Sequence, residues 1–352
     1  MSTVGVSPNV LVSSAGRRHY LVDWFREACH RFDGRVVAAD ADPHAPAGAA
    51  ADSFVRLPPI TSGEYEAALQ EACNEHEIGL AISVNDHELA RWSTLVPVSP
   101  DQPPASLLCL DERGQALVED KLLMAEGMAA QGIPVPTTRS GAMAGGFHSD
   151  VVIKARFGSG SNIVATSHAS TAAADAVRLV PRATDRLNRA IRDEQAALDA
   201  LVVQDRKTGQ EYGVDVVNDF DGNFVGVLAR RKIRMRGGET DQAESVAPDQ
   251  FIELGKSLSR VLGHRGLVDC DVIQSEDGSL WLIDVNPRFG GGYPFSHLAG
   301  ADVPLLYLHW LVGAVPASDL LAYRPGVTSA KHVGLAVVNG SRQAPVRGRT
   351  TE

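Results

Sequence analysis

The chain has 352 residues, of which 44% are hydrophobic and 22% charged, a composition typical of a globular protein with two or three packed units. The formal net charge of −10 argues against a nucleic-acid-binding protein, whose binding face is basic. No apolar run reaches membrane-spanning length, and residues 1–9 lack the basic start and apolar core of a signal peptide. The four cysteines are not spaced as metal ligands or as a disulfide framework, so we expect reduced thiols in a cytoplasmic protein without nucleic-acid or membrane partners.

The first part of the chain predicts a parallel α/β unit. Strands are expected at Asn9–Ser13, Arg35–Asp40 and Gly79–Val84, with helices at Tyr20–Arg31 and Glu64–His76 between them. Strands that alternate with helices form a parallel sheet with right-handed crossovers. The turn after the first strand has one glycine where a dinucleotide fingerprint needs three, which argues against an NAD site there.

Two places in this unit are candidates for substrate contact. Arg17 and Arg18 follow the first strand and either hold an anionic substrate or are two solvated arginines. Asp86 follows a later strand at its carboxyl end, where ligands of open α/β sheets bind, although a helix cap by Asn85 or Asp86 is the simpler account. The proline-rich segment Pro97–Pro104 then predicts a domain boundary.

The second unit contains two lysines in unusual places. A helix is expected at Asp120–Gln131, and Lys121 lies at its start, where the helix dipole disfavours a cation unless an anion is bound. Lys154 lies in the middle of a buried strand, Val151–Ala155, and is followed by the glycine- and serine-rich loop Phe157–Asn162. A bound phosphate explains both the buried Lys154 and the loop that follows it. Taken singly, the lysine could instead reach solvent from an edge strand, and the loop could be a simple turn.

The next stretch predicts a helical segment and then an antiparallel meander. Residues 168–201 have helical periodicity, and strands follow at Leu201–Gln204, Glu211–Val217 and Phe224–Leu228, the first two joined by a turn at 207–209. Five of the seven residues at 230–236 are basic, which suggests either phosphate or carboxylate binding or a solvated face.

The stretch from Val268 to Arg288 predicts a β-hairpin with Asp277-Gly278 as a two-residue turn. In that register Asp271 lies opposite Asp284, and Asn286 lies on the same face. Two carboxylates and an amide oxygen suit a hard cation such as Mg²⁺, although polar residues on a solvated face are the alternative. Arg288 and the glycines of RFGGG follow at once, well placed for an anion.

In chain order, these stretches resemble the ATP-grasp superfamily, and most of all its small stand-alone relatives of the carbamoyl-phosphate synthase large chain. The resemblance is carried by Ser14–Arg18, Lys154–Ser161, Arg231–Thr240 and Ile283–Gly292, and covers about residues 9 to 313. It implies a mixed α/β and α+β architecture, with a Rossmann-like preATP-grasp domain followed by two α+β subdomains that clamp ATP. We expect these three parts at residues 1–104, 105–203 and 204–340, with a tail at 341–352.

The resemblance also implies roles for individual residues. Those expected to bind ATP are Lys121, Lys154, Gly158, Ser159, Gly160, Ser161, Gln204, Asp205 and Glu211. Asp271, Asp284 and Asn286 are expected to bind Mg²⁺, with Mn²⁺ as an alternative ion. The expected catalytic residues are Arg288, Lys154 and Arg234. Residues expected near the substrate are Arg17, Arg18, Asp86, Arg231, Gly291 and Gly292.

The activity implied is that of an ATP-dependent carboxylate–amine ligase, which forms an amide bond through an acyl phosphate and releases ADP and phosphate. Its partners are a small-molecule carboxylate and an amine, and a homodimer is common in the family. Arginines 17, 18, 230, 231 and 234 suggest an anionic acid. A small-molecule kinase with the same ATP site is the alternative, and a nucleotide-binding module without catalysis is a third interpretation.

Overall fold

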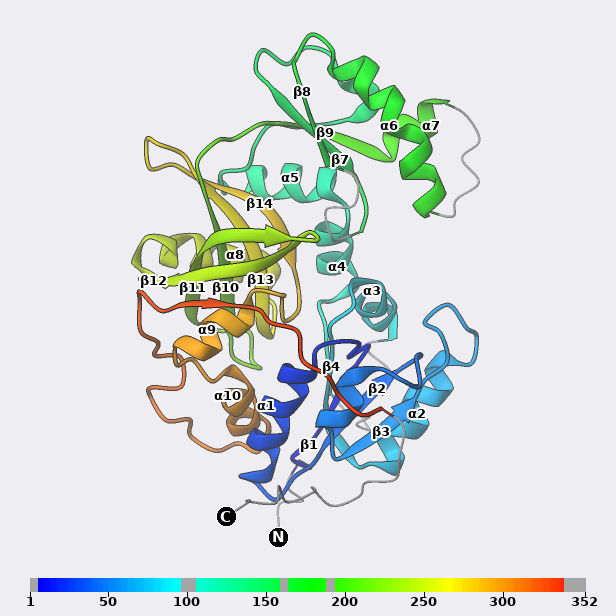
Figure 1. Ribbon diagram of the computed structural model, residues 1–352, viewed down its shortest axis with the longest axis vertical. Coiled ribbons are helices and arrows are strands. Elements are labelled where there is room, and N and C mark those ends of the chain that lie inside the picture. Colours follow the sequence, from blue (N-terminus) through cyan, green and yellow to red (C-terminus); the bar gives the residue numbers. More distant parts are fainter. Residues whose placement is uncertain (1–5, 96–105, 159–163, 188–193, 339–352) are drawn as a thin grey trace, which may run out of the picture.

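The structure is a computed structural model and describes residues 6–95, 106–158, 164–187 and 194–338. Within these residues the chain forms three β-sheets, one after another along the long axis of the molecule (Figure 1). The sheet of the first unit lies at one end, the small sheet of residues 138–205 at the other, and the largest sheet between them.

The first sheet is parallel, with strand order β3-β2-β1-β4-β5. Its elements in chain order are β1 (Asn9–Ser13), α1 (His19–His30), β2 (Val36–Asp40), β3 (Ser53–Arg56), α2 (Tyr65–Glu75), β4 (Ile78–Ser83), α3 (Asp86–Leu95) and β5 (Ser106–Leu108). The predicted α/β alternation is confirmed. Strand β5 pairs with β4 although it follows the proline-rich segment, so this sheet extends past the boundary expected at residue 104.

The second sheet is antiparallel, with strand order β6-β9-β7-β8. Its strands are β6 (Thr138–Ser140), β7 (Val151–Ala155), β8 (Val164–Ser167) and β9 (Leu201–Asp205). Helices α4 (Glu112–Glu119) and α5 (Lys121–Ala130) precede it, and α6 (Ala172–Leu187) and α7 (Glu194–Asp199) lie between β8 and β9. These last two helices form the segment expected to be helical at 168–201.

The third sheet is antiparallel, with strand order β14-β13-β10-β11-β12-β15. It contains β10 (Gln210–Asn218), β11 (Phe224–Arg236), β12 (Glu239–Val246), β13 (Gly266–Gln274), β14 (Leu280–Asn286) and β15 (Thr328–Ala330), with α8 (Ile252–Leu262) between β12 and β13. The prediction that β9 and β10 pair across a turn at 207–209 is wrong, because these strands belong to different sheets. The segment between them links two sheets and is not a hairpin turn.

The third sheet has one apolar and one charged face, as expected when side chains alternate along each strand. Val214, Val216, Val272 and Leu282 lie in one buried hydrophobic cluster with residues of α8. The residues between them face the other way and are mostly charged: Glu211, Asp215, Arg230, Lys232, Asp269, Asp271, Asp284 and Asn286. The charged face of one sheet therefore carries most of the expected site.

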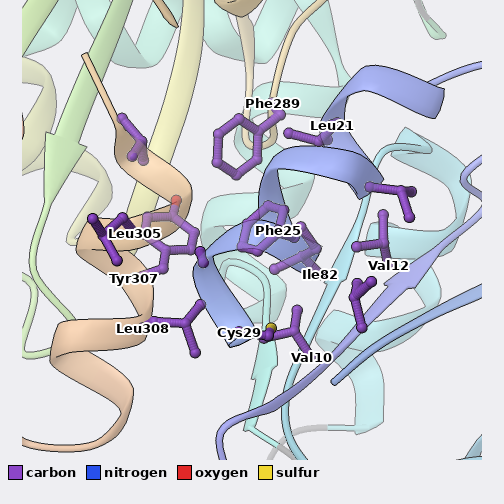
Figure 2. Packing of buried hydrophobic residues seen from close by; sticks show 14 of the residues in the cluster. Val10, Val12, Leu21, Phe25, Cys29, Ile82, Phe289, Leu305, Tyr307 and Leu308 are labelled. Carbon is purple, nitrogen blue, oxygen red and sulfur yellow. The ribbon is translucent and has the colours of Figure 1, made fainter. Parts of the chain in front are cut away.

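A shared apolar core joins the first and the third units. Phe25 of α1 packs against Phe289 and against Tyr307 of α10 (Val303–Leu311), and the valines of β1 lie in the same cluster (Figure 2). Helix α9 (Tyr293–Ala299) adds Tyr293, whose ring lies edge-on to that of Phe289. Burial of large side chains contributes about 1.5–3 kcal/mol each, so this contact fixes the first sheet beside the third. Of the helices that the structure describes, none has the length and hydrophobicity needed to cross a membrane.

Candidate active site

The hairpin of β13 and β14 brings the predicted carboxylates together. Asp271 lies opposite Asp284, as predicted, and Asn286 lies opposite Asp269 on the same face. The expected two-residue turn is wrong, since Gln274 pairs with Leu280 and the Gly278 N–H donates to the Ser275 carbonyl. The turn is one residue longer, and Ile283 restores the register because it forms a β-bulge without a partner across the hairpin.

The oxygens on this face fit a hard divalent cation. The Lys232 ammonium donates to Asp271 Oδ1 at 2.6 Å, which leaves the second oxygen of Asp271 for another ligand. Among the described residues, no donor lies within hydrogen-bond distance of the Asp284 carboxylate, and burial raises the pKa of Asp284 against the opposing charges of Lys121 and Lys154. The Asp284 carboxylate therefore has oxygens free for a metal, and Asp271 lies opposite it. Mg²⁺ commonly binds one or two carboxylates of this kind together with phosphate oxygens.

Two buried lysines lie beside the hairpin. Lys154 of β7 is 8% exposed, and its ammonium donates to the Ile283 carbonyl at 3.3 Å. Burial lowers the pKa of Lys154 to about 8, although the nearby Asp284 carboxylate opposes the change. The Lys121 ammonium, at the first residue of α5, donates to the Gly158 carbonyl. Among the described residues, both lysines thus lie near Asp284 and donate to neutral carbonyl oxygens, an arrangement that suits phosphate groups.

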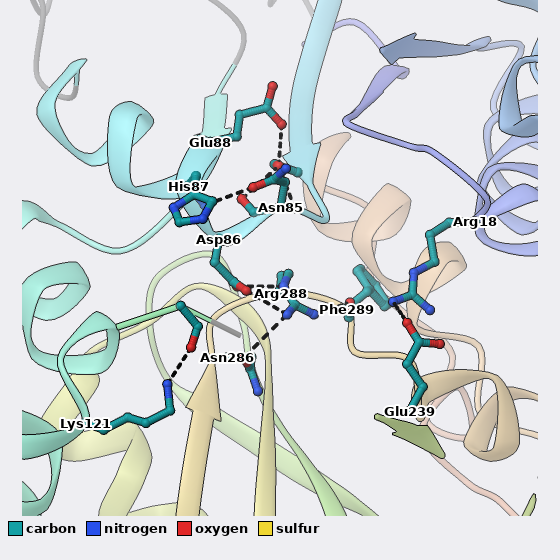
Figure 3. A network of polar contacts seen from close by, with 12 residues as sticks. Arg18, Asn85, Asp86, His87, Glu88, Lys121, Glu239, Asn286, Arg288 and Phe289 are labelled. Carbon is teal, nitrogen blue, oxygen red and sulfur yellow. Dashed lines mark hydrogen bonds and ion pairs between the residues drawn. The ribbon is translucent and has the colours of Figure 1, made fainter. Parts of the chain in front are cut away.

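Arg288 follows the hairpin and contacts the first unit. Its guanidinium makes two bonds to the Asp86 carboxylate, at 2.6 and 2.8 Å, and a longer one to Asn286 Oδ1 at 3.4 Å (Figure 3). Burial opposes ionisation of Arg288, but the charge and hydrogen bonds of Asp86, together with the charges of Asp269 and Asp284, raise its pKa. Asp86 begins α3 at the carboxyl end of β4, and Asn85 accepts from the His87 N–H there. Asn85 is therefore the residue that caps the helix, while Asp86 orients Arg288.

Two family models match the sequence. One, described as PylC-like, N-terminal domain, matches residues 10–95, and the other, described as ATP-grasp in the biosynthetic pathway with Ter operon, matches residues 197–332. Residues 197–332 belong to the ATP-grasp superfamily. The expected ATP-grasp family and the mixed α/β and α+β architecture are thereby confirmed. A comparison with curated proteins found no match.

Solved ATP-grasp structures share the fold over most of their length. Biotin carboxylase from Campylobacter jejuni gives a TM-score of 0.68 at 16% identity and covers 91% of this chain and 74% of its own. L-amino acid ligase from Bacillus licheniformis gives 0.66 at 16% identity, with 93% and 79% covered. N5-carboxyaminoimidazole ribonucleotide synthetase from Thermotoga maritima gives 0.60 at 16% identity, with 89% and 78% covered. At this identity the likeness establishes the ATP-grasp fold.

The residues expected to bind ATP border the link between the second and third sheets. Gln204 is 3% exposed and donates to Thr138 Oγ1 at 2.9 Å, while the Asp205 carboxylate accepts from Ser149 and from Lys207. Their side chains are thus engaged within the protein, and the Asp205 N–H donates to the Thr137 carbonyl, so the expected contact of these residues with ATP stays a prediction. Glu211 begins the next sheet with a half-exposed carboxylate, 3.9 Å from the Lys232 ammonium.

The glycine-rich loop is described only at its start. Gly158 has φ of +84°, a conformation that favours glycine, and is the residue whose carbonyl Lys121 contacts. Ser159, Gly160 and Ser161 lie outside the described residues, so their expected contact with phosphate stays a prediction.

Arg230 has a different role from the one expected of the basic cluster. It is 1% exposed and forms ion pairs with Asp215 and Asp269, so it is not available to an anionic substrate. Two carboxylates around one guanidinium leave a surplus negative charge, and burial raises the pKa of Asp215 to about 7. Sequence reasoning missed this cluster, because Asp215 and Asp269 become neighbours only through the pairing of β10 with β13.

The glycines after Arg288 fit around this cluster. A methyl group added at Gly290 would lie 2.0 Å from Asp269 Oδ2, and one at Gly292 would lie 2.2 Å from Arg230 Nε. Gly290 and Gly292 therefore make room for buried charged groups, whereas we expected an anion beside these glycines. Gly291 differs, since its nearest neighbours are the ends of three exposed or half-buried charged side chains.

The remaining arginines are distributed over the surface around the site. Arg231 pairs with Glu244, and Arg234, with a side chain 58% exposed, pairs with Asp241 at 2.7 Å, so both lie across the β11–β12 hairpin from acidic residues. The structure shows no contact between Arg234 and Arg288 within the described residues. Arg17 is exposed, and Arg18 reaches Glu239 of β12 at 3.2 Å.

Proposed function

We propose that this ATP-grasp protein is an ATP-dependent carboxylate–amine ligase that releases ADP and phosphate. The observation that carries the proposal is the placement of the opposed Asp271 and Asp284 beside two buried lysines and beside Arg288. These groups gather anionic oxygens on one sheet face, and nothing in the proposed chemistry requires a covalent bond to the enzyme. The named ligases with the same fold support the assignment of class.

Each residue has a role set by its place. Asp271, Asp284 and Asn286 are the residues that would hold Mg²⁺, which when bound neutralises charge on phosphate oxygens. Lys154 and Lys121, which lie beside the hairpin near Asp284, contact phosphate groups. Arg288, held by Asp86, stabilises the negative charge that develops on the transferred phosphoryl group.

The proposed reaction has two balanced steps. A carboxylate oxygen of the acid attacks the γ-phosphorus of ATP and displaces ADP, which gives an acyl phosphate. The amine nitrogen then attacks the acyl carbon, phosphate leaves with the bonding electrons, and the nitrogen loses a proton. Exclusion of water is essential, because water would otherwise take the place of the amine.

The test uses hydroxylamine as the amine. The protein is incubated with ATP, Mg²⁺, hydroxylamine and pooled amino and organic acids, and ADP, phosphate and hydroxamate are measured together. We expect all three products in equal amounts. ADP beside a new phosphorylated compound, without phosphate or hydroxamate, would establish the small-molecule kinase instead.

A pair of variants on one hairpin tests the metal site. Asp284→Asn should lower hydroxamate formation about a hundredfold, because it removes a charge that faces the metal and phosphates. Asp277→Asn, at the turn of the same hairpin, is the matched control and should retain activity, since the hydrogen bonds of the Asp277 side chain lie within the turn. Equal activity of the two variants would contradict the proposed site.

A further inference from the structure

Three charged side chains from separate parts of the chain converge on Gly291. A methyl group added there would lie 3.2 Å from Arg18 Nη1, 3.3 Å from Glu239 Oε2 and 3.3 Å from the Lys331 ammonium. Arg18 comes from the segment between β1 and α1, Glu239 from the start of β12, and Lys331 from the residue after β15. Figure 3 shows Arg18 and Glu239 together on the far side of Phe289 from Arg288.

Glu239 is the only acidic partner of this pair of cations among the described residues. Its carboxylate accepts from Arg18 at 3.2 Å and from Lys331 at 2.8 Å. The side chains of Arg18 and Lys331 are 20% and 26% exposed, so both cations are partly shielded from water. Burial opposes ionisation of Glu239, yet Arg18 and Lys331 lower its pKa. The pair of cations thus already binds one carboxylate, which the protein itself supplies.

The bound carboxylate is well suited to be exchanged. Glu239 follows the turn Gly237-Gly238, where both residues have positive φ, and its side chain is 46% exposed. A half-exposed ion pair contributes only about 0–1 kcal/mol, so little free energy opposes its separation. Arg17 and Arg288 add further positive charge near the cluster, so even with Glu239 bound the surroundings favour an anion.

We propose that Arg18 and Lys331 bind a second carboxylate of the acid substrate, and that Glu239 occupies this subsite until the acid displaces it. The acid is then a dicarboxylate, with one carboxylate at the Arg18–Lys331 pair and the other, which is phosphorylated, near Arg288. That the ligand is the acid substrate rests on the proposed ligase function. Binding of the second carboxylate is a property of the cluster itself and is testable without ATP.

The probes are the α,ω-dicarboxylates malonate, succinate, glutarate and adipate. Each is compared with the monocarboxylate of the same carbon count, at matched ionic strength and without nucleotide or divalent metal. Binding to the full chain is measured by calorimetry and by the shift in thermal unfolding temperature. We expect at least one dicarboxylate to bind about tenfold or more tightly than its monocarboxylate, because charge-assisted hydrogen bonds are gained only by the second carboxylate.

Variants separate the cations from their internal partner. Lys331→Gln should weaken dicarboxylate binding about tenfold and leave monocarboxylate binding unchanged. Glu239→Gln should tighten dicarboxylate binding about threefold or more, because the internal competitor loses its charge. Lys256→Gln is the matched control, since Lys256 pairs with Glu253 on the surface of α8.

Three results would overturn the proposal. These are equal binding of dicarboxylates and monocarboxylates, an unchanged preference in Lys331→Gln, and weaker or unchanged dicarboxylate binding in Glu239→Gln. The last would mean that Glu239 contacts the ligand directly or stays in place. Failure of the ligase assignment is distinct, because it would appear as selective dicarboxylate binding without hydroxamate or phosphate when ATP and Mg²⁺ are added.

Discussion

Alanine at Gly290 or Gly292 should destabilise the protein far more than alanine at Gly291 between them. None of the three glycines has positive φ, so alanine is compatible with the backbone at each position and differences must come from the space around the added methyl group. That methyl would lie 2.0 Å from Asp269 Oδ2 at Gly290 and 2.2 Å from Arg230 Nε at Gly292, but 3.2 Å from its nearest neighbour at Gly291.

The expected magnitude follows from what must move. Overpacking of a dense interior costs about 1–3 kcal/mol, and separation of a buried ion pair costs about 3–5 kcal/mol. Gly290→Ala and Gly292→Ala must displace Asp269 or Arg230, so we expect a loss of about 3 kcal/mol or more. At Gly291 the neighbours are ends of flexible side chains, and we expect a change below about 1 kcal/mol, partly offset by the smaller entropy of the unfolded chain.

The assay is urea unfolding at neutral pH, followed by tryptophan fluorescence and by far-ultraviolet circular dichroism. Coincident transitions from the two probes justify a comparison of free energies of unfolding. If all three variants unfold at the same urea concentration, the glycines do not make room for the Asp215–Arg230–Asp269 cluster, and the structural explanation of this motif is refuted.

Three further predictions concern charged residues of the site. Asp86→Asn removes the charge that orients Arg288 and should lower kcat about tenfold or more while ATP affinity changes little; a loss confined to KM would contradict this role. Because burial lowers the pKa of Lys154 to about 8, ATP binding above that pH should take up a proton, seen by calorimetry in buffers of different ionisation enthalpy and absent in Lys154→Met. Burial raises the pKa of Asp215 to about 7 despite the opposing Arg230, so the folded state binds the extra proton. The extra proton on Asp215 stabilises the folded state fully below the unfolded pKa of about 4, and this contribution is lost as pH rises through about 7. Asp215→Asn should remove this part of the pH dependence of the free energy of unfolding.

The structural features that the sequence predicted correctly are those set by residues close to one another in the chain. The prediction that Asp271 lies opposite Asp284 is correct because two departures from the expected hairpin cancel: the turn is one residue longer, and the bulge at Ile283 restores the register. The buried strand around Lys154 was likewise predicted from its five residues. In both cases the determining interactions lie within a single strand or hairpin.

Contacts between distant segments were not predictable in this way. The pair Asp86–Arg288 joins residues 202 positions apart, and each residue alone has an ordinary explanation as a cap or a phosphate ligand. The turn at 207–209 looked like a hairpin because both flanking strands alternate, but alternation does not tell which strand is the partner. Arg230 was expected to bind an anion or to lie on a solvated face, because it is one of five basic residues among seven and the run itself does not show that Arg230 is buried.

The bulge at Ile283 separates two properties of one strand. Because Ile283 has no partner across the hairpin, deletion of this residue would let β14 continue in regular register with Asp284 still facing Asp271. What would disappear is the carbonyl that accepts from Lys154 at 3.3 Å. Because of this single extra residue, the Lys154 contact does not depend on the pairing of Asp271 with Asp284. Either feature can therefore change in evolution while the other is kept.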